Sequence, residues 1–122
     1  LNRLLYQIHQ PSRRMGEYRK GRLLLKGWCF SFDLLPIVRV RVLTSSQCKE
    51  GRALVHCPAV GDIFGAGEYI SKCGFEVADL RVGRGVTDFT LEIFIKERGW
   101  LPVCHRSIHV PWIGSKVRIH MP

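Results

Sequence analysis

Cys104 and His105 are the two neighbouring residues best suited by type to nucleophilic catalysis, in which an imidazole activates a thiol. They lie in a segment that reads as a β-strand, so their side chains should point to opposite faces of a sheet and stay apart. Acid–base catalysis needs a pair of carboxyl groups, but several Asp residues fall in or near expected turns, where Asp is common for conformational reasons. These are Asp33, Asp62, Asp79 and Asp88. We therefore expect this chain not to be an enzyme.

The spacing of potential metal ligands does not indicate a metal site either. His105 and His109 are four residues apart, which places them on one face of a strand but roughly 13 Å from each other. No two of the five cysteines have the short separation of a zinc knuckle or a redox pair. We expect neither a metal nor a cofactor.

The cysteines are better explained as reduced, structural thiols of a cytoplasmic protein. Their number is odd, and Cys29, Cys73 and Cys104 lie in or beside apolar segments, where a free thiol behaves as a small hydrophobe. The alternative is one disulfide, between Cys48 and Cys57, across a short hairpin.

The stretch GDIFGAGEY, residues 61–69, has three glycines and could be mistaken for a phosphate-binding loop. Such a loop runs from a strand into a helix and needs Lys-Ser or Lys-Thr after its last glycine. Here Gly67 is followed by Glu-Tyr-Ile-Ser, and no helical pattern follows. We predict instead a surface connection that crosses between two sheets.

Sugar binding is the chemistry that the tryptophans favour, because an indole can lie against the apolar face of a pyranose. Trp100 follows Arg98 and Gly99 at an expected hairpin tip, where a large aromatic has little structural purpose. We expect Trp100 to stack on a glycan while Arg98 and Glu97 bond its hydroxyls. Trp28, inside an apolar segment, should belong to the core.

Cations are concentrated at the N-terminus of a chain whose net charge is +9. We expect a basic cluster to dock an acidic surface, on a catalytic domain of the same polypeptide or on a separate protein partner. Its members are Arg13, Arg14, Arg19, Lys20, Arg22 and Lys26. Nucleic acid is a weaker alternative, because no zinc finger, helix-turn-helix or RNP strand accompanies this charge.

The elements that must position these residues are short strands, separated by Gly, Pro, Asp and Ser. Residues 37–43 should direct Val38, Val40 and Val42 to one face, and residues 87–97 should bury alternate side chains from Phe89 to Ile95. One helical turn is expected near residues 58–65. About seven or eight strands predict an all-β, antiparallel, immunoglobulin-like sandwich.

We divide the chain into a basic linker or edge segment, residues 1–21, and a β-sandwich domain, residues 22–122. No apolar run approaches the length of a membrane span. The N-terminus has neither an initiator Met nor the apolar segment of a signal peptide, so we expect an excised cytoplasmic domain.

The order of the motifs resembles a known family. A strand with Gly27-Trp28 precedes IVRVRVL, the pair Gly51-Arg52 precedes a loop that begins CPAVGDIFG, and Cys73-Gly74-Phe75 opens the strand after that loop. This order is similar to the small β-sandwich domain fused to many bacterial glycosyltransferases and related sugar-handling enzymes. In that family the loop carries an Arg and an Asp, which are absent from Cys57-Pro58-Ala59-Val60 here.

The resemblance implies a non-catalytic accessory module of a glycosyltransferase-type multidomain protein, used for domain docking or for glycan or acceptor binding. The alternative is a stand-alone immunoglobulin-like protein-interaction module. A basic nucleic-acid-binding domain is a further, weaker alternative.

Overall fold

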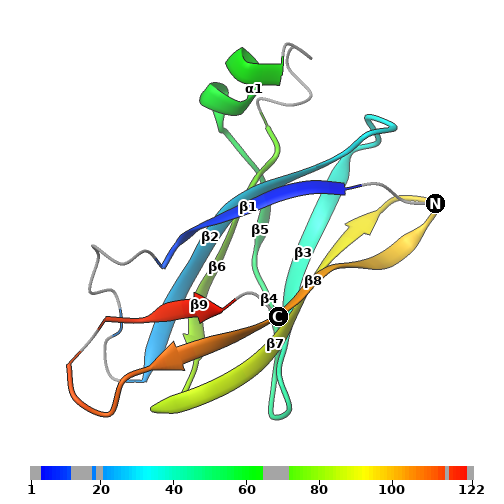
Figure 1. Cartoon of the computed structure of the whole chain (residues 1–122). Helices are drawn as coiled ribbons and strands as arrows, with labels where there is room; N and C mark the ends of the chain where they lie inside the picture. The colour runs from blue at the N-terminus through cyan, green and yellow to red at the C-terminus, as the bar shows by residue number, and fades with distance from the viewer. Residues whose placement is uncertain (1–3, 12–17, 19–20, 65–71, 115, 121–122) are drawn as a thin grey trace.

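The computed structural model describes residues 4–11, 18, 21–64, 72–114 and 116–120. Two antiparallel sheets face each other across an apolar core (Figure 1). The described residues form nine strands and one short helix. The elements are β1 (Leu4–Gln10), β2 (Arg22–Ser31), β3 (Ile37–Leu43), β4 (Cys48–Glu50), β5 (Arg52–Val55), α1 (Pro58–Phe64), β6 (Gly74–Arg81), β7 (Gly85–Ile95), β8 (Gly99–Val110) and β9 (Arg118–His120).

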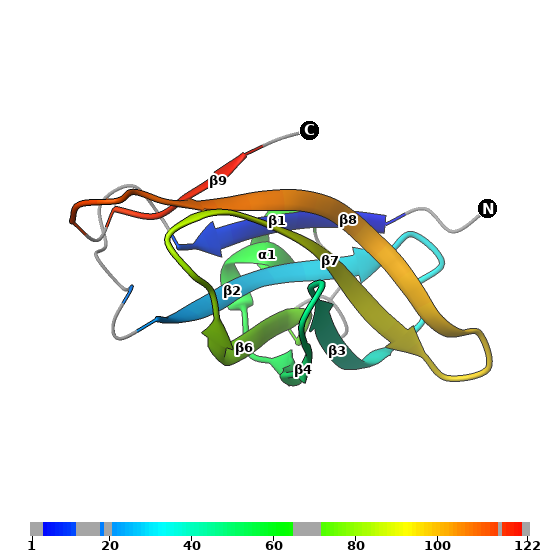
Figure 2. The same cartoon turned by 90° about the horizontal axis from the view of Figure 1, so that it is seen from below.

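The strand order is that of an immunoglobulin-like sandwich. One sheet has the order β1-β2-β6-β5 and the other β4-β3-β7-β8-β9. These orders correspond to the ABED and C′CFG sheets of the immunoglobulin fold, with β9 added beyond the last strand. The predicted fold class is therefore confirmed, and the long β7–β8 hairpin spans the molecule in Figure 2.

Two of these strands lie in segments to which we had assigned no strand. β1 lies in the segment 1–21 that we assigned to a linker or an edge, and it pairs with β2 at the edge of the smaller sheet. β4 lies in the polar stretch 44–51, which we expected to be only a turn. The turn is shorter, because the Thr44 amide donates to the Gln47 carbonyl at 2.9 Å and the chain then pairs back with β3.

Alternation along the strands builds the core. Phe89, Leu91, Ile93 and Ile95 of β7 are all buried, which confirms the predicted inward face. On β3 the prediction holds for Val40 and Val42, but it is wrong for Val38, which is exposed. The register shifts between Ile37 and Arg39, and this bulge turns Val38 outward.

A second apolar cluster lies outside this core, under α1. Trp28 contacts it and is only half-buried, so the prediction that it belongs to the main core is wrong. Its ring stacks on Phe30 with centroids 5.8 Å apart and meets Phe64 of α1 at 6.0 Å. Trp28 and Phe30 point outward because the core positions of β2 are taken by Leu25 and Cys29, among others.

The helix α1 confirms the predicted helical turn. It joins β5 to β6, which are neighbours in one sheet, so the expected crossing between two sheets is wrong. Gly61 belongs to α1, and the remainder of the glycine-rich stretch, from residue 65, lies outside the described residues. Within the described part of the chain, no helix is long and apolar enough to cross a membrane.

Candidate functional site

Among the described residues, the solvent-facing side of the five-stranded sheet, here called the outer face, carries four cross-strand polar pairs. Because successive strand residues alternate between the two faces, β7 directs Asp88, Thr90, Glu92 and Phe94 outward. The neighbouring strands add side chains that meet these residues in register. The outer face therefore carries a row of side-chain pairs over β3, β7 and β8.

An aromatic pair forms one end of this row. Trp100 of β8 is directly opposite Phe94 of β7, and their rings meet edge-to-face with centroids 5.4 Å apart. Two guanidinium groups from β3 lie over the same indole. Their carbons are 3.9 Å from its centroid for Arg41 and 4.9 Å for Arg39.

Both arginines are oriented by carboxylates. Arg39 donates Nη2 to Oε1 and Nε to Oε2 of Glu50, at 2.6 and 3.0 Å, which is a bidentate arrangement. Arg41 donates to Oε1 of Glu92 at 2.7 Å. The hydrogen bonds from Arg39 lower the pKa of Glu50, and those to Glu50 raise the pKa of Arg39.

Two further hydrogen-bonded pairs continue the row along β7 and β8. The hydroxyl of Thr90 is 2.9 Å from Nδ1 of His105, and Ser107 donates to the carboxylate of Asp88 at 2.6 Å. A groove with a volume of about 440 Å³ lies here, lined by Leu43, Thr44, Ser45, Val86, Thr87, Asp88, Phe89, Thr90 and His105. Its walls offer hydroxyl, carboxylate and imidazole groups in one place.

The structure does not bring the three residues expected to bind a glycan into one site. Arg98 donates Nη2 to the carboxylate of Asp33 at 2.6 Å, in the turn between β2 and β3. Glu97 lies in the β7–β8 turn, where its φ is +82° and its side chain is exposed. Trp100 instead meets Phe94, Arg39 and Arg41, so its neighbours come from other strands and not from its own turn.

The structure describes only two of the six residues of the basic cluster. Arg13, Arg14, Arg19 and Lys20 lie outside the described residues. Lys26 forms an ion pair with Glu76 at 3.3 Å. Arg22 is exposed at the start of β2, opposite Arg81 of β6.

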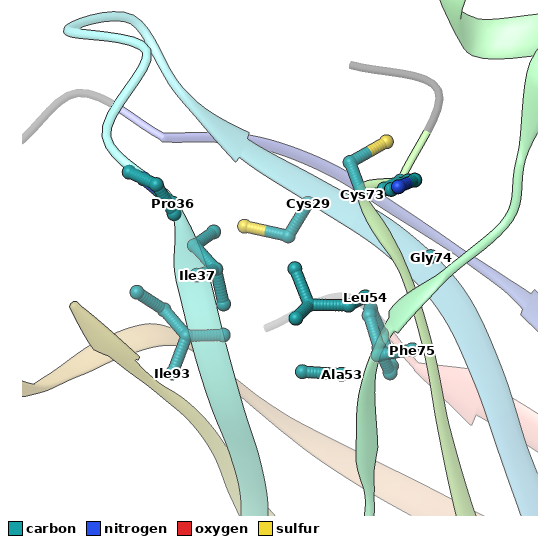
Figure 3. Close-up of a pocket in the computed structure, with 10 residues that line it drawn as sticks. Cys29, Pro36, Ile37, Ala53, Leu54, Cys73, Gly74, Phe75 and Ile93 are labelled. Atoms are coloured by element: carbon teal, nitrogen blue, oxygen red, sulfur yellow. The ribbon is translucent and has the colours of Figure 1, made fainter. Parts of the chain in front are cut away.

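A further pocket is mostly apolar. It has a volume of about 240 Å³ and opens between the two sheets, beside β3 and β5 (Figure 3). It is lined by Cys29, Pro36, Ile37, Ala53, Leu54, Lys72, Cys73, Gly74, Phe75 and Ile93. In Figure 3 the sulfur of Cys29 points toward Pro36 and Ile37, whereas that of Cys73 points away.

These two thiols are suited to packing and not to nucleophilic attack. Burial raises the pKa of Cys29 to about 12, and burial likewise raises that of Cys73 to about 11. Both are therefore protonated at neutral pH, and the thiolate is the reactive form. All five cysteines are unbridged in this structure.

Cys104 and His105 are separated as predicted. His105 is on the outer face beside Thr90, whereas Cys104 packs against the core. Burial raises the pKa of the Cys104 thiol, although Tyr6 and Arg106 nearby act in the opposite direction. Among the described residues no three His, Cys, Asp or Glu side chains are grouped closely enough to hold a metal ion.

Comparison with known proteins does not extend this description. No protein-family model matches the chain, and no curated protein matches it significantly.

Sequence reasoning missed most of the outer face. The alternation within residues 87–97 did place Thr90, Glu92 and Phe94 together. The partners Arg39, Arg41 and His105 come from segments whose pairing depends on strand order, and local periodicity does not report strand order.

Proposed function

We propose that this chain is a non-catalytic carbohydrate-binding module, whose ligand lies along the outer face of the five-stranded sheet. The observation that carries the proposal is the outer row itself, in which an indole is followed by polar groups that hold one another in fixed orientations. Sugar recognition needs both features, an apolar platform for the ring and preorganised hydrogen-bonding groups for the hydroxyls.

The dimensions favour an oligosaccharide over a single sugar. Trp100 and Ser107 are seven residues apart on β8, which corresponds to about 20 Å along a strand with one irregularity. Arg41 and Arg39 both lie over the Trp100 ring. The proposal therefore assigns the pyranose ring to the part of the indole that the two arginines and Phe94 leave exposed, with the glycan running toward the groove beside His105.

Each polar pair retains capacity for a ligand. A carboxylate has about four lone-pair positions, of which its partner arginine or serine uses one or two. Glu92 and Asp88 can therefore accept from sugar hydroxyls without losing Arg41 or Ser107. Because these side chains are held in place before binding, little rotamer entropy is lost when the ligand arrives.

Docking on an acidic surface through the basic cluster is the competing proposal. Of the two cluster members that the structure describes, Lys26 is paired with Glu76 and Arg22 is exposed. The connection to a glycosyltransferase-type parent protein continues to depend on the motif order alone.

A glycan array tests the proposal with the wild-type chain and three variants. Trp100→Ala removes the platform, and Asp88→Asn alters the groove at an exposed position while keeping its shape. Trp112→Ala is the matched control, because it removes an exposed tryptophan that lies beyond the opposite end of β8. Folding of every variant is checked by circular dichroism.

The proposal is supported if the wild type and Trp112→Ala bind the same glycans and both outer-face variants lose at least tenfold in affinity. Absence of binding by the wild type across the array would overturn it. Binding retained by folded Trp100→Ala and Asp88→Asn would place the sugar elsewhere and would also overturn it.

A further inference from the structure

The connection between β8 and β9 exposes two adjacent apolar side chains at one end of the molecule. In residues 111–114, here called the Trp112 finger, Trp112 is 76% exposed and Ile113 is 90% exposed. Val86, at the start of the neighbouring strand β7, is 66% exposed and also lines the groove of the outer face. Singly exposed apolar residues need no explanation, but a cluster at the tip of a loop indicates an interaction site.

The finger is held in shape by the protein. Arg84 donates Nη1 to the carbonyl oxygens of Pro111 and Gly114, at 2.7 and 2.8 Å. A Cβ placed on Gly85 would lie 3.6 Å from the Trp112 ring, so the indole lies close over this glycine. The exposure of Trp112 and Ile113 is therefore a feature of an organised turn.

Cationic side chains lie beside the finger. Beside it is a hollow of about 610 Å³, lined by His109, Pro111, Ile113, Gly114, Lys116 and Arg118. The ends of β2 and β6, with Arg22 opposite Arg81, lie at the same end of the molecule (Figure 1). The Trp112 finger thus combines exposed apolar side chains with neighbouring cationic side chains.

We propose that the Trp112 finger docks on an anionic phospholipid bilayer. An indole beside an aliphatic side chain favours the boundary between head groups and acyl chains, where its apolar ring and its N–H are both satisfied. With Trp112 and Ile113 at that depth, Lys116 and Arg118 lie beside them at the level of the lipid phosphates. A convex apolar tip with flanking cations fits a deformable anionic surface.

Vesicle flotation tests this inference with phosphatidylcholine vesicles, with and without about one-third phosphatidylserine. We expect the wild type to bind only the anionic vesicles. The double variant Trp112→Ala/Ile113→Ala should lose more than tenfold in partitioning, because both side chains lose their apolar burial. Lys116→Gln and Arg118→Gln should each lose roughly fivefold, the value expected for one cation near an anionic surface.

Ile63→Ala is the matched control. Ile63 is 74% exposed, but it belongs to α1, which lies at the top of Figure 1 and away from the β8–β9 connection. Its substitution should leave vesicle binding unchanged. The tryptophan emission should also shift to the blue on anionic vesicles, and this shift should disappear in Trp112→Phe, which retains an apolar ring.

Two results would overturn the inference. One is no binding of the wild type to anionic vesicles, and the other is equal binding by the wild type and the folded double variant. If heparin or polyglutamate is bound in a Trp112-dependent manner and vesicles are not, the finger belongs to a soluble acidic partner instead.

Discussion

The guanidinium carbon of Arg41 lies 3.9 Å from the centre of the Trp100 ring, although β3 and β8 are not paired with each other. The strand between them, β7, supplies Glu92, which binds Arg41 at 2.7 Å. A cation, an anion and an aromatic ring from three strands therefore form one unit. In this unit Trp100 is both the proposed sugar platform and a structural residue.

Replacing Trp100 should consequently reduce stability as well as binding. Trp100→Ala removes the contact with Phe94 and the stacking of two arginines, which should together lower the free energy of unfolding by about 2 kcal/mol. Urea denaturation measures this change. Trp112→Ala, at an exposed position, should remain within about 0.5 kcal/mol of the wild type. Equal effects of the two substitutions would mean that the Arg41–Trp100 contact does not contribute to stability.

Gly27 is a position where the fold permits no side chain. A Cβ there would overlap the backbone carbonyl of Gln7 in β1 and lie 2.9 Å from Cζ of Phe75. Gly27→Ala should cost about 3 kcal/mol in thermal or chemical unfolding, because neighbouring strands must move apart. Gly83→Ala is the matched control, since a Cβ at Gly83 meets nothing within 4 Å. A Gly27→Ala variant as stable as Gly83→Ala would contradict this packing.

The raised pKa of the Cys29 thiol predicts a loss of stability at high pH. Its pKa is about 12 in the folded protein, against 9.0 for an unperturbed thiol, because burial disfavours the thiolate. Because the pKa is higher in the folded protein, the contribution of the protonated Cys29 thiol to the free energy of unfolding is complete below pH 9. This contribution falls as the pH rises from 9 to 12. The slope is about 1.4 kcal/mol per pH unit in that window. Urea unfolding between pH 8 and 10.5 should show a shallower decline in Cys29→Ala than in the wild type.

Thiol labelling gives a second measure of the same burial. Cys48 is exposed on the edge strand β4, whereas Cys29 is buried. Iodoacetamide at pH 8 should therefore label Cys48 first, and Cys29 should be protected until the protein unfolds. Peptide mass spectrometry reads out both rates. Rapid labelling of Cys29 in the folded protein would be incompatible with its position in the core.

The Arg39–Glu50 pair predicts an effect at low pH. Arg39 lowers the pKa of Glu50, so the carboxylate contributes to stability above its unfolded pKa near 4.5, and this contribution is lost as the pH falls through the lowered value. The melting temperature of the wild type should therefore exceed that of Glu50→Gln at pH 7, with the difference shrinking toward pH 3. A difference that is constant over this range would show that ionisation of Glu50 does not matter.

Local pattern was sufficient for much of the fold. Alternation identified the inward face of β7, and the frequency of short strands predicted the sandwich, because both depend on neighbouring residues in one strand. The same reasoning missed β4, whose three residues are too few to show a period, and it misplaced Val38, because a bulge interrupts the alternation.

The sequence by itself determined the fold class, the helical turn at α1 and the separation of Cys104 from His105, since each follows from the geometry of one local element. The tertiary structure alone decided which strands are neighbours. Only strand order and register bring Arg41 and Glu92 to Trp100, attach Arg98 to Asp33, and carry Arg84 under the Trp112 finger. These contacts join residues far apart in the chain, and nothing in the local pattern of one segment specifies its partner in another.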